Sequence, residues 1–251
     1  MNEIKNLPQI IILYGPVACG KGTQSQILKQ KLPNYTHLET GGSLREFVHL
    51  HIGHYYKPEI TPDPNSTQED IAIATSIKQN LVNMDPVPAQ NLRYVLDKKI
   101  EKLLESGQNL IVDGVGRTKE ESKWFAGLLA SKNLSVAIFH LHLSELNTIN
   151  RSTHRFYAPD NKNPFPTYDS AKANCPIGQK PYQRPEDQDV DGISKRYHQM
   201  YGDNWASMLS IYQKAVRCDL LTIDAGQTIT EVTAEILAYL EFYYGTGLGN
   251  L

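Results

Sequence analysis

The stretch that decides the fold is IIILYGPVACGKGT, residues 10–23. Its apolar start, Ile10–Tyr14, is typical of a buried strand, and a glycine-rich turn then leads to Lys21 and Thr23. A strand, such a turn with a lysine, and a helix are the context of a phosphate-binding loop. Backbone N–H groups and the positive helix end would face phosphate oxygens, with Thr23 near a phosphate or magnesium. The alternative is a glycine-rich turn with a chance lysine.

Outward from this stretch, strand-like and helix-like segments alternate. Short apolar runs predict further strands at Tyr35–Glu39, Leu110–Asp113, Val136–Leu143 and Leu220–Asp224. Helical periodicity is clearest in Thr23–Leu32, Leu92–Leu104, Ile193–Ala215 and Ile229–Tyr243. This alternation predicts an α/β fold, a P-loop three-layer sandwich with a central five-stranded parallel sheet and helices on both faces. We expect Thr228 or Gln227 to begin the last helix.

Proline placement marks two excursions from the sheet. Eleven of the 14 prolines lie in residues 58–88 and 159–185. Because proline lacks a backbone donor and is excluded from central strands and helix interiors, we expect both segments to be partly irregular and to move.

Composition narrows the classes of partner and compartment. The chain has 251 residues, of which 21% are charged, and a net charge of −2, which argues against long basic tracts for nucleic acid or anionic lipid. Three widely spaced cysteines, Cys19, Cys175 and Cys218, do not form a disulfide framework pattern. The run Ile10–Leu13 is too short for a signal sequence or a membrane span. We therefore expect a cytoplasmic protein.

Asp113 is a candidate metal ligand. It ends a predicted strand, and ligands of open parallel sheets bind at that edge. A carboxylate there can hold magnesium directly or through water. The alternative is that Asp113 caps the following helix.

Six motifs, in order, resemble those of the adenylate kinase family of nucleoside monophosphate kinases. They are GKGTQ at 20–24, TGGSLR at 40–45 (the family's T-G-D-x-L-R), DGVGRT at 113–118 (D-G-F-P-R-T), the pair Arg151 and Arg155, RPED at 184–187 followed by Arg196, and DAG at 224–226. The resemblance runs from residue 10 to about 240 and is thin within the proline-rich segments. Six of the eight arginines fall at these motifs, and the planar guanidinium fits phosphate oxygens at two points.

The resemblance implies ATP with Mg²⁺ and a nucleoside monophosphate, AMP first, as ligands. It implies that ATP is bound by Gly15, Cys19, Gly20, Lys21, Gly22, Thr23, Gln24, Arg151 and Gln227. It implies that the acceptor is bound by Thr40, Gly41, Arg45, Val87, Gly114, Arg117 and Glu121. The implied catalytic residues are Lys21, Arg117, Arg151, Arg155, Arg184 and Arg196. Asp113 and Thr23 would serve magnesium, directly or through water.

The resemblance also implies a division of the chain. Residues 1–40, 88–154 and 185–244 would form the core P-loop domain, 41–87 an insertion that binds the monophosphate, and 155–184 a lid over ATP. Residues 245–251 would be a flexible tail. Closing the insertions would exclude water, which competes as acceptor. We expect the protein to be a monomer. We expect no structural zinc, because the lid holds only one cysteine and such zinc sites usually need several.

Several histidines could be mistaken for metal ligands. We expect His49, His51 and His54 to be a solvated helix end. We expect His140 and His142, which alternate on one face of a strand, to be satisfied by neighbouring residues.

Several residues depart from the family pattern. Ala18 is acceptable only at negative φ. Gly42 replaces an acid, Gly116 replaces a proline and would loosen the turn before Arg117, and Val17 also departs. Glu121 stands where the family has glutamine against the acceptor base. An ionised carboxylate only accepts hydrogen bonds, which suits a base with two donors such as guanine, so the acceptor base could be relaxed or shifted.

Two other functions remain open from the sequence. One is a non-catalytic or weakly active nucleotide-binding protein, which would keep the loop and Lys21 but not need the arginines. The other is a P-loop kinase acting on another small acceptor, which would need a base or an orienting acid, such as Glu121 or Asp113.

Overall fold

The computed structural model describes residues 7–53, 62–159 and 164–245. His54, Pro58 and all of the expected tail except Gly245 therefore lie outside the described residues.

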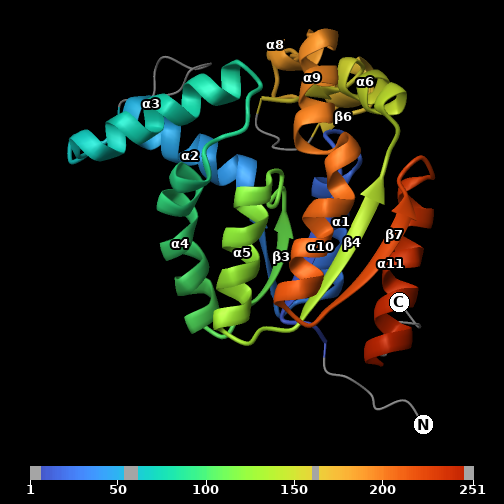
Figure 1. The fold of residues 1–251 in the computed structure, drawn as a ribbon. Coiled ribbons are helices and arrows are strands. Elements are labelled where there is room, and N and C mark those ends of the chain that lie inside the picture. The colour runs from blue at the N-terminus through green and yellow to red at the C-terminus, as the bar shows by residue number, and fades with distance from the viewer. Residues whose placement is uncertain (1–6, 54–61, 160–163, 246–251) are drawn as a thin grey trace.

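A five-stranded parallel sheet forms the middle of the molecule (Figure 1). Its strands are β1 (Ile10–Tyr14), β2 (Tyr35–Glu39), β3 (Asn109–Asp113), β4 (Val136–His142) and β7 (Cys218–Asp224). Their order is β2-β3-β1-β4-β7, and every neighbouring pair is parallel. All five predicted strands are present, which confirms the predicted sheet and P-loop fold class.

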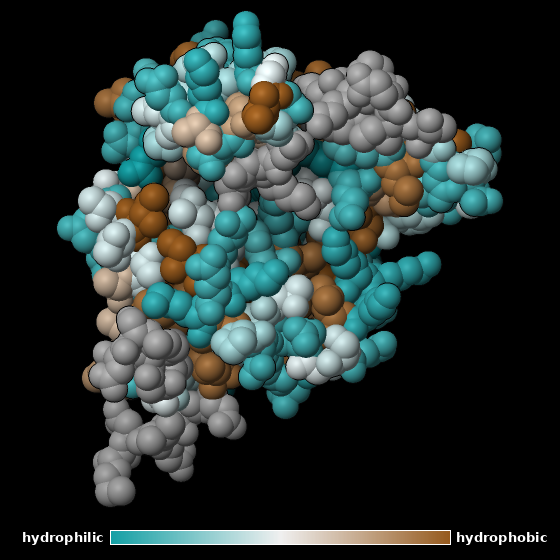
Figure 2. Space-filling model, turned by 180° about the vertical axis from the view of Figure 1, so that it is seen from behind, coloured by the Kyte–Doolittle hydropathy of each residue, from teal (hydrophilic) through white to brown (hydrophobic). Residues whose placement is uncertain are grey.

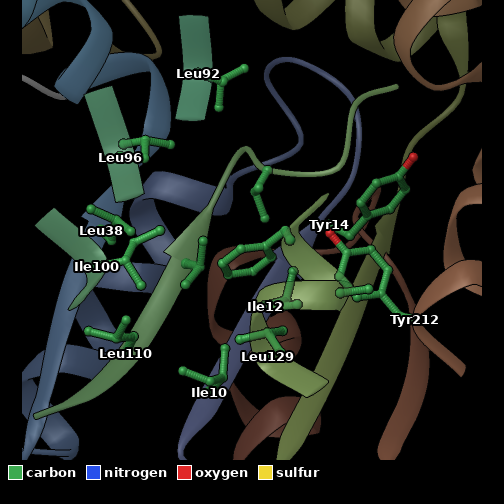
Figure 3. Close-up of a cluster of buried hydrophobic side chains, with 14 of the residues drawn as sticks. Ile10, Ile12, Tyr14, Leu38, Leu92, Leu96, Ile100, Leu110, Leu129 and Tyr212 are labelled. Atoms are coloured by element: carbon green, nitrogen blue, oxygen red, sulfur yellow. The ribbon is translucent and has the colours of Figure 1, made fainter. Parts of the chain in front are cut away.

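Helices cover both faces because alternate strand side chains point to opposite sides. α4 (Ala89–Glu105), α5 (Lys119–Ser131) and α10 (Trp205–Ala215) cover one face, where Ile10 and Ile12 are fully buried. Figure 3 shows this cluster, with Leu96 and Ile100 of α4 on one side and Tyr212 of α10 on the other. Full burial of one such aliphatic side chain contributes about 1.5–3 kcal/mol.

The opposite face packs on α1 (Lys21–Lys31) and α11 (Ile229–Tyr244). There Ile11 and Leu13 of β1 meet Leu28 of α1 and Ile236 of α11, all fully buried. β1 lies between these two helix layers, which explains why its sequence is an unbroken apolar run. It also fixes the loop between β1 and α1 at the carboxyl edge of the sheet.

Side-chain caps set two helix starts that bear on the site. Thr228 caps α11 in a capping box with Glu231. Of Thr228 and Gln227, the two residues expected to begin this helix, the cap is therefore Thr228. Thr118 caps α5 by accepting from the Glu121 N–H. The alternative that Asp113 caps this helix is therefore wrong, and its carboxylate is left for another role.

One predicted helix is two. The segment predicted as a single helix over 193–215 divides into α9 (Val190–Met200) and α10, with the 3₁₀ turn Gly202–Asn204 between them. Tyr201 leaves helical geometry at φ −147° and ψ −91°, and Gly202 follows at φ +25°. Glycine adopts positive φ without the clash of a Cβ, and this bend turns α10 back onto the sheet.

The proline-rich segments contribute no described strand to the five-stranded sheet and are less irregular than expected. The first includes α3 (Gln68–Val82), a helix that starts at a Thr67 capping box and packs on α2 (Thr40–Ile52). The second comes after α6 (Glu145–Thr153) and β5 (Phe156–Tyr157). It includes β6 (Pro164–Phe165) and α7 (Tyr168–Lys172) and ends at the start of α8 (Pro185–Gln188). These elements lie beyond the carboxyl edge of the sheet (Figure 1).

Among the described residues, no helix is both long and apolar enough to cross a bilayer. On the face seen in Figure 2, hydrophobic residues lie in small groups among hydrophilic ones.

Candidate functional site

A cavity of about 620 Å³ opens at the carboxyl edge of the sheet. The loop between β1 and α1 forms its floor, and its walls come from α2, α6, α9, α11 and the segment that holds β5 and β6. The cavity thus lies where open parallel sheets bind ligands.

The loop at the floor, residues 15–23, depends on its backbone. A Cβ at Gly15 would lie 2.4 Å from the backbone oxygen of Leu141, so the loop can approach β4 only with glycine there. Ala18 has φ +58°, and the expectation of a negative φ is wrong. The turn requires left-handed geometry at this position, which costs a residue with a Cβ about 1–2 kcal/mol relative to glycine.

Lys21 lies folded over this loop. Its Nζ donates to the backbone oxygens of Gly15 at 3.0 Å and Pro16 at 2.6 Å, and lies 3.6 Å from the Cys19 Sγ. The ammonium is therefore satisfied by neutral carbonyls, which phosphate oxygens can replace with stronger, charge-assisted contacts.

Six arginines from separate parts of the chain line the same cavity. They are Arg45 on α2, Arg117 after β3, Arg151 on α6, Arg155 before β5, Arg184 before α8 and Arg196 on α9. The pKa of Arg196 falls to about 9, because burial disfavours its charge and Arg117, Arg45 and Arg155 repel it. Crowded positive charges of this kind fit a polyanionic ligand, which would remove the repulsion.

Contacts within the protein orient the arginines from the second half of the chain. Arg155 makes a two-point ion pair with the buried Asp187, one contact being Nε to Oδ2 at 2.9 Å. The Arg184 guanidinium lies 4.1 Å from the centre of the Tyr157 ring. Arg151 donates from Nη2 to the Gly226 backbone oxygen at 3.4 Å.

The nine residues expected to bind ATP all line the cavity. They are Gly15, Cys19, Gly20, Lys21, Gly22, Thr23, Gln24, Arg151 and Gln227. Of the seven residues expected to bind the acceptor, Gly41, Arg45 and Arg117 line it.

The other four acceptor candidates do not line this cavity. Thr40 is buried at the start of α2, and Val87 is buried in the core cluster. Gly114 lies under the Arg117 guanidinium, where an added Cβ would be 2.6 Å from Nη2. Its role is to leave room for that arginine.

Glu121, the fourth, is turned toward the backbone of the loop before α5. Its Oε2 accepts from the Arg117 N–H at 2.9 Å, and the residue is 1% exposed. Burial raises the pKa of this carboxyl, and the Arg117 charge opposes the rise. The hypothesis that Glu121 reads the acceptor base therefore finds no support in its position.

Gly116 is closely packed in the same loop. It has φ +78°, which proline cannot adopt, and an added Cβ would lie 2.7 Å from the Tyr212 hydroxyl. The glycine was expected to loosen the turn before Arg117. The structure instead closes that turn with Glu121 on one side and Tyr212 on the other.

Oxygen donors for magnesium are present at the edge of the sheet. Asp113 is 7% exposed and lines the cavity together with Thr23. Burial raises the pKa of the Asp113 carboxyl, and the Lys21 charge opposes that rise. Within the described residues, no three His, Cys, Asp or Glu side chains gather as a metal cluster. Such a site fits Mg²⁺, which keeps several waters and binds through one or two carboxylates plus substrate phosphates.

Two histidines on β4 fix a tyrosine of the cavity wall. His140 Nε2 and His142 Nδ1 each lie 2.8 Å from the Tyr201 hydroxyl, and His140 Nδ1 lies 3.2 Å from Thr222 Oγ1. Both histidines have polar neighbours, as expected. The network anchors the end of α9, the helix that carries Arg196.

Sequence reasoning missed several cavity residues, notably Glu39 and Phe165. Phe165 lies in a segment where no periodic pattern was readable. Glu39 had a readable signal, because it ends a predicted strand directly before the motif TGGSLR.

Comparisons with known proteins agree with this geometry. The family model described as an AAA domain matches residues 14–155. The adenylate kinase of Desulfotalea psychrophila is 25% identical over 246 residues, covering 92% of this chain and 98% of that protein. The adenylate kinase of Chlamydia trachomatis serovar D is 24% identical over 230 residues, covering 92% and 89%. That of Chlamydia felis is 25% identical over 238 residues, covering 95% and 99%.

Proposed function

We propose that this chain, which belongs to the AAA-domain family of P-loop proteins and resembles adenylate kinases, transfers the γ-phosphoryl group of ATP to a nucleoside monophosphate. AMP is the first candidate acceptor, so that the reaction would be ATP + AMP = 2 ADP. The single observation that carries the proposal is the lining of one cavity by a phosphate-type loop, Lys21 and six arginines.

This set of cations exceeds what one bound nucleotide needs. The loop amides and Lys21 suffice to hold the phosphates of a single ATP. Arg45 and Arg117 lie on the α2 side of the cavity, where a second phosphate compound would have its own partners. The surplus of guanidinium groups favours transfer between two phosphorylated ligands over simple nucleotide binding.

Each residue then has a role in the transfer. The loop and Lys21 would hold the β and γ phosphates, and Arg45 and Arg117 the acceptor phosphate. The bond from the γ phosphorus to the β–γ bridging oxygen breaks, its electron pair stays on ADP, and an acceptor phosphate oxygen bonds to that phosphorus. The other arginines, Arg151, Arg155, Arg184 and Arg196, would neutralise charge on the transferred group.

No general base is required, because the acceptor phosphate is already an anion at neutral pH. Catalysis would consist of positioning and charge neutralisation. Mg²⁺, when bound, would supply further neutralisation of the phosphates, with Asp113 and Thr23 as the fitting oxygen donors. The rival kinase on another acceptor would need a base, and Glu121 is occupied by the Arg117 N–H.

The expected division of the chain is part of this proposal. Residues 41–87 would close over the acceptor and 155–184 over ATP, in a monomeric cytoplasmic enzyme. Amide exchange of both segments should slow when paired nucleotide analogues bind. Unchanged exchange in both would contradict the closure.

Turnover with four acceptors tests the function. ATP is incubated with AMP, GMP, CMP or UMP, and diphosphate products are separated and measured. Lys21→Ala and Arg117→Ala should abolish product, whereas Arg93→Ala, an exposed arginine on α4 that pairs with Asp97, should not. ATP binding without turnover for any monophosphate would establish the non-catalytic alternative.

A further inference from the structure

Glu39 is an acid of the cavity that the proposed function has not used. It is the last residue of β2, and its register partner on the neighbouring strand is Asp113, the last residue of β3. Both residues line the cavity together with Lys21. Two carboxylates therefore stand on adjacent strand ends beside the phosphate loop.

Gly42 leaves the space that the Glu39 carboxylate occupies. A Cβ added at Gly42 would lie 2.7 Å from the Glu39 Oε2 and 3.1 Å from its Cδ. The three heavy atoms nearest to that position all belong to the Glu39 carboxylate. Position 42 is where the motif TGGSLR lacks the acid of the pattern it resembles. The Glu39 carboxylate thus occupies the space that an acidic side chain at position 42 would take.

Neither carboxylate accepts a hydrogen bond from the described residues. Among the described residues, the Glu39 side chain forms no hydrogen bond and no ion pair. Within the same part of the chain, Asp113 has one ion-pair contact, to His37, whose Nε2 lies 4.0 Å from Oδ2. Two carboxylates that face a phosphate site without hydrogen-bond donors would repel phosphate unless a cation lies between them.

A counter-ion role for Glu39 fits less well. The Arg45 Nη1 lies 3.3 Å and the Arg117 Nη2 3.9 Å from the Cβ position of Gly41, and the Glu39 Oε1 lies 3.9 Å from the same point. The guanidinium groups are therefore near, but Glu39 forms no ion pair with either one.

We propose that Glu39, with Asp113, holds the water ligands of the divalent cation that accompanies the ATP phosphates. The inference rests on the proposed function, because it places ATP in this cavity. It adds Glu39 as a positioning residue for the cation and explains why Gly42 is tolerated. Mg²⁺ binds through few carboxylates and retains its waters, so the acids that orient those waters set its affinity.

Manganese binding tests this role without relying on turnover. Mn²⁺ is titrated into the full chain saturated with a non-hydrolysable ATP analogue, and free Mn²⁺ is measured by electron paramagnetic resonance. Glu39→Gln should raise the Mn²⁺ dissociation constant about tenfold or more, the usual cost of losing a group that orients a metal ligand. Affinity for the analogue in EDTA, measured by calorimetry, should not fall.

Two further variants make the test specific. Glu46→Gln removes an exposed acid of α2 that pairs with Lys99 and lies outside the cavity lining, and it should leave Mn²⁺ affinity unchanged. The double variant Glu39→Ser with Gly42→Asp moves the carboxylate to position 42 and should restore most of the affinity. This rescue would not occur if Glu39→Gln acted only by disturbing the fold.

The outcomes separate the two proposals. Mn²⁺ affinity of Glu39→Gln within twofold of the wild type would overturn the role of Glu39 and leave the proposed function standing. A wild-type chain that does not bind the ATP analogue would overturn both.

Discussion

The cavity has two sides whose arginines are held by different means. On the core side, Arg117 follows β3, and its backbone N–H is fixed by the buried Glu121, with Tyr212 packed against the same turn. On the lid side, Arg155 and Arg184 flank a segment with two-residue strands and are held by Asp187 and the Tyr157 ring. The core side is built into the packing of the sheet, whereas the lid side depends on polar and aromatic contacts.

Under the proposed closure, this difference would leave one side of the cavity preformed while the other side moves. The core side keeps its geometry without ligand because moving Arg117 would disturb buried residues. The lid side can exchange its contacts for phosphate oxygens at lower cost, because few apolar residues hold it. We therefore expect core-side variants to change folding as well as activity, and lid-side variants to act locally.

The largest expected effect comes from removing a core-side guanidinium. Arg117→Ala should lower kcat on the order of a thousandfold, because Arg117 would hold the acceptor phosphate in position for attack, and catalysis consists of positioning and charge neutralisation. Steady-state kinetics against Arg93→Ala as control measures it. A loss of less than tenfold would place Arg117 outside the reaction.

The second effect tests the lid side. Asp187→Ala removes the buried partner of Arg155, whose side chain is 16% exposed, and breaking such a pair costs about 3 kcal/mol. Because this side is locally held, the loss should appear as faster amide exchange in residues 151–190, whereas β1 and β3 keep their protection. Equal loss of protection in the central strands would show that the two sides do not differ as described.

The third effect tests the turn of the core side. Gly116→Ala places a Cβ at φ +78° and 2.7 Å from the Tyr212 hydroxyl, so unfolding free energy should fall by about 1–2 kcal/mol. Urea denaturation measures this change. Gly127→Ala is the matched control, since a Cβ there has open space in α5 and should not destabilise.

A pH dependence of stability provides the fourth test. Burial lowers the pKa of His140 to about 4, and the neighbouring His142 adds to this. The unfolded chain binds this proton below about pH 6.5 and the folded chain does not, so stability falls as pH drops from 6.5 toward 4. The slope from this group is at most about 1.4 kcal/mol per pH unit. His140→Gln should show a shallower slope in the same denaturation series; an unchanged slope would contradict the burial argument.

The smallest expected effect concerns the acceptor base. Glu121→Gln should leave the order of preference among AMP, GMP, CMP and UMP unchanged, because the Glu121 carboxylate is bonded to the Arg117 N–H outside the cavity lining. A switch in preferred base would restore the hypothesis that residue 121 contacts it.

The sheet was predictable because its three inner strands, β1, β3 and β4, are short apolar runs buried on both faces. The break at Tyr201 was not, because the apolar pattern continues across it and only tertiary packing turns α10 back. Ala18 was misjudged for a similar reason, since its φ follows from the path of the loop. The cavity arginines were identifiable from motif order. The contact made by the Glu121 side chain was not identifiable from the sequence, because its partner is the backbone N–H of Arg117, which no side-chain pattern reveals.

A crystal structure with a two-headed inhibitor, two nucleosides joined by a phosphate chain, tests the central claim most directly. We predict that the phosphate chain runs from the loop and Lys21 to Arg45 and Arg117, with Arg151, Arg155, Arg184 and Arg196 within hydrogen-bond distance of it. If both nucleosides bind and these guanidinium groups remain turned away from the phosphates, the account is contradicted.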